Sequence, residues 1–305
     1  MEVRRLGTSA LDVTVVGLGC NNFGGRIDEN ASRAVIDAAL DAGVTFFDTA
    51  DVYGNRGGSE EIIGRALEGR RDRVVLATKF GHDLGDGETA LGARPYIRKA
   101  VEASLRRLRT DRIDLYQYHR PDGVTPLEET LEALHELVQE GTVRAIGSSN
   151  FTAQMVEDAH AVAAERGLTP FVSEQSEYSW LKRGAEDELL PACERLGVGF
   201  IPYFPLASGI LTGKYARGAP APEDTRLHGR EIEEQHFDAV ERLEAFAREQ
   251  GVSLLDVAIG GLAAVPGVAS VIAGATKPEQ VLANAAAGAW EPDADTLAEL
   301  LALPR

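Results

Sequence analysis

GVTFFDTADVYG, residues 43–54, is the stretch that decides the fold. Thr45, Phe46 and Phe47 are β-branched or aromatic, as is typical of a buried strand, and this strand runs into Asp48. Tyr53 follows on the loop after it. An acid at a strand end with a phenol just beyond it forms a candidate acid–base pair. A turn-capping Asp and a core Tyr would look the same from residue types alone.

Two further apolar stretches end in residues that carry chemistry. VVLATKF, residues 74–80, contains Lys79 at its end, and IDLYQYH, residues 113–119, ends in His119. Lys79 with Asp48 could be a structural ion pair, and His119 alone could be a core histidine. Taken together, three strand ends supply Asp, Lys and His, and the adjacent loop supplies Tyr53.

Strand and helix patterns alternate along the whole chain. We predict strands at 15–19, 45–48, 73–79, 113–118, 143–148, 171–175, 199–203 and 268–273. We predict helices at 29–42, 59–68, 95–108, 127–139, 152–165, 185–196, 234–249, 253–264, 278–287 and 293–302. Alternation of this kind implies parallel strands with crossover helices. Eight such units predict an α/β fold, a closed (β/α)8 TIM barrel, as one domain over residues 1–305 with extra C-terminal helices. A short hairpin at 3–13 is expected to close one end.

An open-sheet dinucleotide fold is disfavoured. Gly17 and Gly19 begin a G-x-G-x-x-G pattern, but the third glycine is replaced by Asn22, so the Rossmann fingerprint fails.

The motif set resembles the aldo-keto reductase family. GVTFFDTADVYG, GGSEEIIGRAL, ATKF and LYQYHRPD occur in order and at family-like spacing. The resemblance implies an eight-stranded α/β barrel that uses a nicotinamide cofactor, and it matches Asp48, Tyr53, Lys79 and His119 to the catalytic tetrad. In such a site the Tyr53 phenol is the proton donor, and the Lys79 cation is expected to lower its pKa. Asp48 keeps Lys79 charged, while His119 orients the carbonyl or assists proton transfer.

The resemblance also implies a cofactor site. Polar strand ends would hold the nicotinamide carboxamide, an aromatic would stack on its ring, and residues 203–215 would cover the pyrophosphate. The expected cofactor-binding residues are Gly19, Cys20, Asn21, Asp48, Ser149, Asn150, Gln175, Tyr203, Phe204, Pro205, Leu206, Ala207, Ser208, Gly209, Lys214, Arg226, Gly274, Thr276, Lys277, Gln280 and Asn284. Lys277 and Arg226 are cations able to meet a 2′-phosphate, so NADPH is expected, with NADH possible.

The substrate is the least defined part. Phe23, Asp51, Phe80 and Trp180 are candidate pocket walls, and the expected substrate is a small aldehyde, ketone or sugar in an open site. The long segment Phe204–Arg230 contains several glycines and prolines and lacks apolar periodicity. It is therefore expected to be irregular and to close over the dinucleotide.

Composition excludes several other classes. The 305 residues carry a net charge of −17, which disfavours nucleic acid as a partner. No apolar run reaches the length of a membrane span or a signal peptide, so we expect a cytoplasmic protein. The six histidines and two cysteines show no metal-ligand spacing, so no metal is expected. Cys20 could be a reactive thiol or a buried filler, and the sequence does not define the oligomeric state.

Two other functions remain open. A cofactor-binding regulatory subunit on the same fold would resemble the potassium-channel β subunits of this family, in which catalysis is weak. An aldose dehydrogenase, working in the oxidative direction, would share every residue named above.

Overall fold

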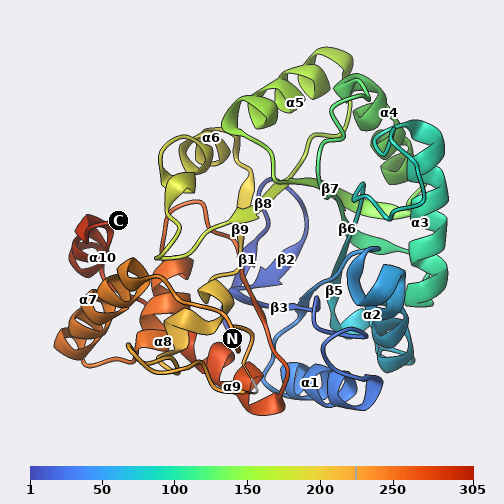
Figure 1. Cartoon of the computed structure of the whole chain (residues 1–305). Coiled ribbons are helices and arrows are strands. Elements are labelled where there is room, and N and C mark those ends of the chain that lie inside the picture. The colour runs from blue at the N-terminus through green and yellow to red at the C-terminus, as the bar shows by residue number, and fades with distance from the viewer. Residues whose placement is uncertain (224) are drawn as a thin grey trace.

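The computed structural model describes residues 1–223 and 225–305. Its main sheet contains eight strands: β3 Val16–Gly19, β4 Phe46–Asp48, β5 Val75–Phe80, β6 Ile113–Tyr118, β7 Val143–Ser149, β8 Ser173–Glu177, β9 Gly199–Tyr203 and β10 Val271–Gly274. They lie in the order β10-β3-β4-β5-β6-β7-β8-β9, with every neighbouring pair parallel. A parallel bridge between Phe200 and Val268 brings the edges together, so the barrel is nearly closed. The predicted (β/α)8 fold is confirmed (Figure 1).

Helices surround this barrel (Figure 1). They are α1 Glu29–Asp41, α2 Tyr53–Ala66, α3 Arg94–Leu108, α4 Leu127–Gln139, α5 Ala153–Arg166, α6 Leu189–Leu196, α7 Glu234–Gln250, α8 Leu254–Asp256, α9 Pro278–Ala287 and α10 Ala294–Ala302. Helix α1 shows how the sequence specifies them. The Asp28 side chain caps the free amide of Ala31 at 2.9 Å, and Val35, Ile36 and Ala39 form the buried face.

Some boundaries differ from the sequence prediction. The predicted strand 171–175 lies two residues later, because the ladder with β9 begins at Ser173. The apolar pair Phe171 and Val172 misled the prediction, since β8 itself buries polar side chains such as Glu174. The predicted helix 185–196 is divided into a 3-10 turn, Gly184–Glu186, and α6. The predicted helix 253–264 is divided into α8 and a π-helical turn at Val257–Gly261.

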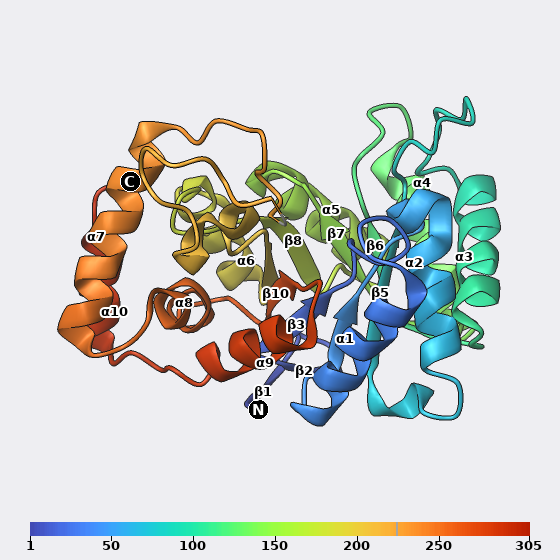
Figure 2. The same cartoon turned by 60° about the horizontal axis from the view of Figure 1, so that its bottom comes forward.

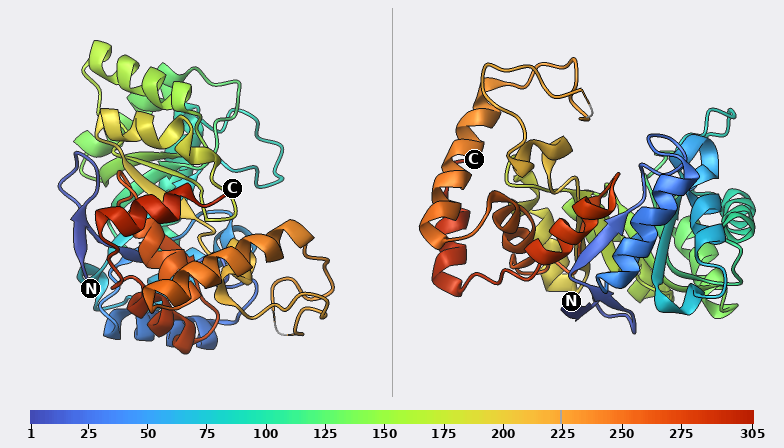
Figure 3. Two further views of the ribbon diagram at one scale, coloured as in Figure 1. Left: turned by 90° about the vertical axis from the view of Figure 1, so that its left-hand side faces the viewer. Right: turned by 90° about the horizontal axis from the view of Figure 1, so that it is seen from below.

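The N-terminal hairpin closes the lower end of the barrel. Strands β1 Val3–Arg5 and β2 Asp12–Thr14 pair antiparallel. Leu6, Leu11 and Val13 pack against inward-facing barrel residues, among them Phe46 and Leu115. Figure 3 shows the hairpin and the N-terminus at one end of the barrel and the long segment after β9 at the other. The end with the carboxyl termini of the strands is therefore the one available for a site.

The segment after β9 is more ordered than its composition predicts. Residues Ala207–Thr212 form a short 3-10 turn, and Ile210, Leu211 and Tyr215 are buried. Figure 2 shows the chain beyond them arching over the upper end of the barrel before it enters α7. Only the part after Tyr215 fits the expectation of an irregular segment, because the first part has apolar anchors of its own.

Candidate active site

A cavity of about 600 Å³ opens at the carboxyl ends of the barrel strands. This volume lies within the range of about 300–1,000 Å³ that is usual for ligand pockets. Its wall includes strand-end residues from β3, β4, β8, β9 and β10, together with His119 and Asn150 just beyond β6 and β7. The cavity thus occupies the place where (β/α)8 barrels carry their active sites.

A buried ion pair lies beneath one end of this cavity. Lys79 Nζ lies 2.6 Å from Asp48 Oδ2, and the Lys79 side chain is fully buried. Asp48 Oδ1 accepts hydrogen bonds from Gln117 Nε2 at 3.0 Å and Gln175 Nε2 at 2.9 Å. Lys79 also donates to the carbonyl oxygen of Thr49 at 2.9 Å. Burial lowers the pKa of Lys79, but the Asp48 carboxylate and Tyr53 outweigh it, so the net shift is upward and Lys79 stays charged.

Tyr53 is held above this pair by an unusual turn. It is the first residue of α2, yet the next four residues have left-handed backbone angles, from Gly54 (φ 65, ψ 47) to Gly57 (φ 105, ψ −2). A Cβ on Gly54 would lie 2.5 Å from the carbonyl oxygen of Phe23, so only glycine fits there. The regular helix therefore starts after this turn, close to the predicted residue 59.

The Tyr53 phenol contacts Lys79 and lines the cavity. Lys79 Nζ lies 5.2 Å from the centroid of the Tyr53 ring. The pKa of Tyr53 is raised, because burial outweighs the opposing effect of the Lys79 cation. This corrects the expectation of a lowered pKa: the ammonium limits the rise but does not reverse it. The phenol is protonated at neutral pH and available as a donor.

His119 stands beside Tyr53 as a neutral ring. Their ring centroids are 5.9 Å apart in an edge-on arrangement. Burial, and then the nearby Lys79, His82 and Arg120, lowers the pKa of His119 to about 2. Its buried Nδ1 has no hydrogen-bond partner in the described chain. A neutral imidazole can hold a carbonyl oxygen but cannot supply a proton as an imidazolium, so the geometry favours the orienting role over acid catalysis.

The polar groups beyond β7 and at the end of β8 mostly bind one another. Asn150 Nδ2 donates to Ser149 Oγ, Asn150 Oδ1 accepts from the Tyr203 hydroxyl at 2.8 Å, and Ser149 Oγ donates to the Gln175 carbonyl. Gln175 uses its Nε2 for Asp48 and Gln117. Its Oε1 has no partner in the described residues and remains available as an acceptor at the cavity wall.

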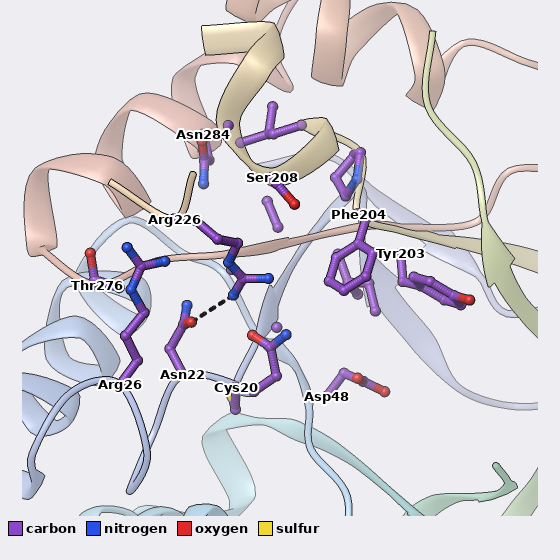
Figure 4. A pocket seen from close by; sticks show the side chains of 18 of the residues that line it. Cys20, Asn22, Arg26, Asp48, Tyr203, Phe204, Ser208, Arg226, Thr276 and Asn284 are labelled. Carbon is purple, nitrogen blue, oxygen red and sulfur yellow. Dashed lines mark hydrogen bonds between the residues drawn. The ribbon is translucent and has the colours of Figure 1, made fainter. Parts of the chain in front are cut away.

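The other end of the cavity carries cations and amides. Figure 4 shows Arg26, Thr276 and Asn284 away from Asp48, and it marks the hydrogen bond from Arg226 to Asn22. That bond joins Arg226 Nη2 to Asn22 Oδ1 at 2.9 Å, and the guanidinium also lies over the Phe204 ring at 5.7 Å. The structure thus ties the segment after β9 to the loop after β3.

Nearly all of the residues expected to bind cofactor line this one cavity. The wall includes Gly19, Cys20, Asn21, Asp48, Ser149, Asn150, Gln175, Tyr203, Phe204, Pro205, Leu206, Ser208, Gly209, Lys214, Arg226, Gly274, Thr276, Gln280 and Asn284. Ala207 and Lys277 are not part of it. Lys277 is the N-cap residue of α9 and is exposed, and the adjacent Thr276 lines the cavity, so its contact with a 2′-phosphate stays a prediction.

The four candidate substrate walls lie in the core. Phe23 and Phe80 are fully buried, Asp51 and Trp180 nearly so, and none of the four lines the cavity. Phe80 stacks on Tyr116 and Tyr118, and Trp180 Nε1 donates to the Val257 carbonyl at 2.8 Å. This corrects the expectation, because residue type near a strand end does not tell which way a side chain points.

Several wall residues were missed by sequence reasoning. Asn22, Arg26, His82 and Arg120 line the cavity. Arg120 follows His119 directly in LYQYHRPD, so its place in the motif was a usable signal. Asn22 was considered only as the missing third glycine. Cys20 is a wall residue with no exposed surface, and burial raises its thiol pKa well above the usual value, which suits a filler and not a reactive thiol.

Comparison with known proteins places this geometry in a family. The model of the aldo/keto reductase family matches residues 15–303. The chain belongs to the aldo-keto reductase family. One relative, "Uncharacterized oxidoreductase YrpG" of Bacillus subtilis, is 40% identical over 92% of this chain and 89% of its own. "Aldo-keto reductase YhdN" of the same organism is 36% identical over 95% and 89%. "Probable voltage-gated potassium channel subunit beta" of rice is 39% identical over 93% and 90%.

Two features are absent from the part of the aldo-keto reductase chain that the structure describes. In the part that the structure describes, no helix combines the length and the apolar character needed to cross a bilayer. The described His, Cys, Asp and Glu residues form no group of three or more that could hold a metal ion.

Proposed function

We propose that this protein is an oxidoreductase that interconverts small aldehydes, ketones or sugar carbonyls and their alcohols, with NADPH as the preferred cofactor. The observation that carries the proposal is the buried Asp48–Lys79 pair beneath a protonated Tyr53, with a neutral His119 alongside. These groups meet at one end of a cavity that continues past the cationic Arg26 and Arg226. Family membership supports oxidoreductase chemistry in general.

The described residues fit a nicotinamide dinucleotide. Gln175 Oε1 is a free acceptor at the catalytic end, suited to a carboxamide NH2. Gly209 has φ +92 and no side chain, which leaves the Lys214 ammonium beside its backbone on the cavity wall. Cations at the far end, such as Arg226, suit phosphate groups. When bound, the nicotinamide supplies or accepts the hydride.

The protein's own residues handle the proton. In the reductive direction the Tyr53 hydroxyl donates its proton to the carbonyl oxygen, and the adjacent Lys79 ammonium stabilises the phenolate that remains. Asp48 keeps Lys79 charged and fixes its position through the 2.6 Å contact. His119 donates a hydrogen bond to the same oxygen and orients the substrate. In the oxidative direction these roles reverse, so an aldose dehydrogenase is served by the same groups.

Cofactor oxidation with a panel of aldehydes, ketones and sugars tests the proposal, with NADPH and NADH run in parallel. We expect turnover with several aldehydes and a lower KM for NADPH. Cofactor binding without turnover of any carbonyl or alcohol would favour the other candidate, a regulatory subunit. That candidate rests on the plant relatives named as probable potassium channel β subunits, which are 39% and 37% identical to this chain.

A further inference from the structure

Arg120 is a cation at the catalytic end of the cavity that neither the fold nor the proton chemistry uses. His119 and Arg120 directly follow β6. The His119 amide donates a hydrogen bond to the carbonyl of Phe80, the last residue of β5, at 2.8 Å, which fixes the backbone beside Arg120 at this end of the barrel. Arg120 lines the cavity and is exposed. The structure shows no hydrogen bond or ion pair for its guanidinium with any described residue.

Neither Asp122 nor Glu177 forms an ion pair with Arg120. Asp122, two residues further along the same loop, accepts hydrogen bonds from Gly92 N, Val124 N, Thr125 N and Thr125 Oγ1. Glu177, at the end of β8, pairs with Lys182 at 2.9 Å. Arg120 is therefore left facing the cavity with its charge available to a ligand.

The charge of Arg120 reaches the groups that surround a substrate. Burial is the main cause of the low pKa of His119, and Arg120 and His82 add to it. Arg120 also opposes the burial that raises the pKa of Tyr203. The rings of His82 and His119 are 5.1 Å apart, so His82 lies at the same end of the wall. A carbonyl held by His119 thus has a cation within reach of the rest of the molecule.

The same cavity wall also carries an apolar surface. Phe204 is 41% exposed although it is a large hydrophobic residue, and it lines the cavity together with Val52. The wall therefore combines a carbonyl-binding point, an aromatic face and a free guanidinium. Since the chain carries a net charge of −17, an anionic substrate is repelled by the molecule as a whole and needs a local cation of this kind.

We infer that Arg120 selects carbonyl substrates that carry an anionic group, a carboxylate or a phosphate, on a short body. The inference rests on the proposed function and adds the substrate class to it. A guanidinium binds either anion through paired N–H donors, and such charge-assisted bonds are the stronger class of hydrogen bond. Arg120 is a specificity residue in this account and takes no part in the proton transfer.

Matched aldehyde pairs test this inference. 4-Carboxybenzaldehyde and its methyl ester differ by one carboxylate charge, and glyceraldehyde 3-phosphate differs from glyceraldehyde by a phosphate group of about −1.5 to −2 charge at neutral pH. With Arg120→Gln we expect kcat/KM for at least one anionic aldehyde to fall about tenfold, mainly through KM, while its neutral partner changes less than about twofold. Arg120→Lys should retain part of the preference. Arg248→Gln, an exposed α7 position outside the cavity, is the control and should change neither pair.

The pattern of losses identifies the anion. A loss confined to the carboxylate pair or to the phosphate pair supports the inference and names the group. Equal effects of Arg120→Gln on charged and neutral aldehydes, or no effect on either pair, would overturn it while leaving the proposed function intact. Absence of turnover with all four aldehydes in the wild-type protein would overturn the proposed function and this inference with it.

Discussion

Lys79 Nζ and Asp48 Oδ2 lie 2.6 Å apart, with the Lys79 side chain fully buried and that of Asp48 3% exposed. Two charges removed from water in this way are stable only as a pair. Two neutral amides, Gln117 and Gln175, complete the surroundings of the carboxylate. The pair therefore connects the stability of the barrel to the chemistry at its mouth.

Removal of one partner should destabilise the fold. Lys79→Met leaves the Asp48 carboxylate buried without its counter-charge, so we expect a loss of about 3–5 kcal/mol in the free energy of unfolding. The double variant Lys79→Met/Asp48→Asn removes both charges and should recover much of that loss. Urea unfolding of the wild type, of Lys79→Met, of Asp48→Asn and of the double variant measures the coupling between the two residues. If the double variant is as unstable as the sum of the two single ones, the pair does not act as a unit.

Arg226 should discriminate between the two cofactors. It lines the end of the cavity remote from Asp48, so Arg226→Ala should weaken NADPH binding about tenfold and NADH binding much less. Lys277→Ala, at a position outside the wall, is the comparison and should have a smaller effect than the sequence alone predicts. Fluorescence titration of each variant with NADPH and with NADH measures the two dissociation constants. If Arg226→Ala weakens the binding of NADPH and NADH equally, Arg226 does not contact the 2′-phosphate.

The two parts of the segment after β9 should differ in how their hydrogen exchange responds to the cofactor. Ile210, Leu211 and Tyr215 are buried, so residues 207–215 should be protected from hydrogen exchange with or without NADPH. Residues 216–223 and 225–230 are held at the cavity by the Arg226–Asn22 bond, and they should gain protection when NADPH binds. Asn22→Ala should reduce that gain and speed cofactor release. If residues 216–223 and 225–230 exchange equally with and without NADPH, the segment is a static part of the cavity wall and does not close over the cofactor.

The contribution of Asp51 to stability should fall as the pH rises from about 4 to 8. Burial, and then the nearby Glu60, raises the pKa of Asp51 from 3.8 to about 8, and neither carboxyl oxygen has a hydrogen-bond partner in the described chain. The folded state therefore binds a proton that the unfolded state has already lost in this range, which lowers stability as the pH rises. Burial likewise raises the pKa of Glu174 to about 7, with the same sign.

Asp51→Asn tests this pH dependence. The neutral amide removes the need for the bound proton, so the variant should gain stability relative to wild type at pH 8 and gain little at pH 4. Some slope should remain because Glu174 is unchanged. Unfolding midpoints in urea at the two pH values are the measurement. A difference between variant and wild type that is independent of pH would show that Asp51 is ionised in the folded protein.

The sequence predicted the barrel and the four central groups because both depend on strand ends. A strand end fixes where Asp48, Lys79 and His119 emerge, and parallel strands bring those ends together. The direction in which a side chain points was not predictable in the same way. Phe23, Phe80 and Trp180 lie at or after strand ends, but their side chains are buried in the core. The left-handed turn after Tyr53 requires Gly54, but two of its four left-handed residues, Asn55 and Arg56, are not glycine, so the composition of GNRGG (54–58) did not predict the turn. Arg120 was visible in its motif, but its lack of a partner is a property of the folded chain.

Tyr53→Phe tests the central claim most directly, because it removes one hydroxyl and leaves the ring that packs beside His119. The phenol acts in the transition state, so we expect kcat for aldehyde reduction to fall by about 10²–10⁴-fold, while the Kd for NADPH stays near the wild-type value. Tyr96→Phe, a tyrosine outside the cavity, is the matched control and should keep full activity. Steady-state kinetics with cofactor titration gives both numbers. Retention of more than about half of the wild-type kcat by Tyr53→Phe would contradict the assignment of Tyr53 as the proton donor.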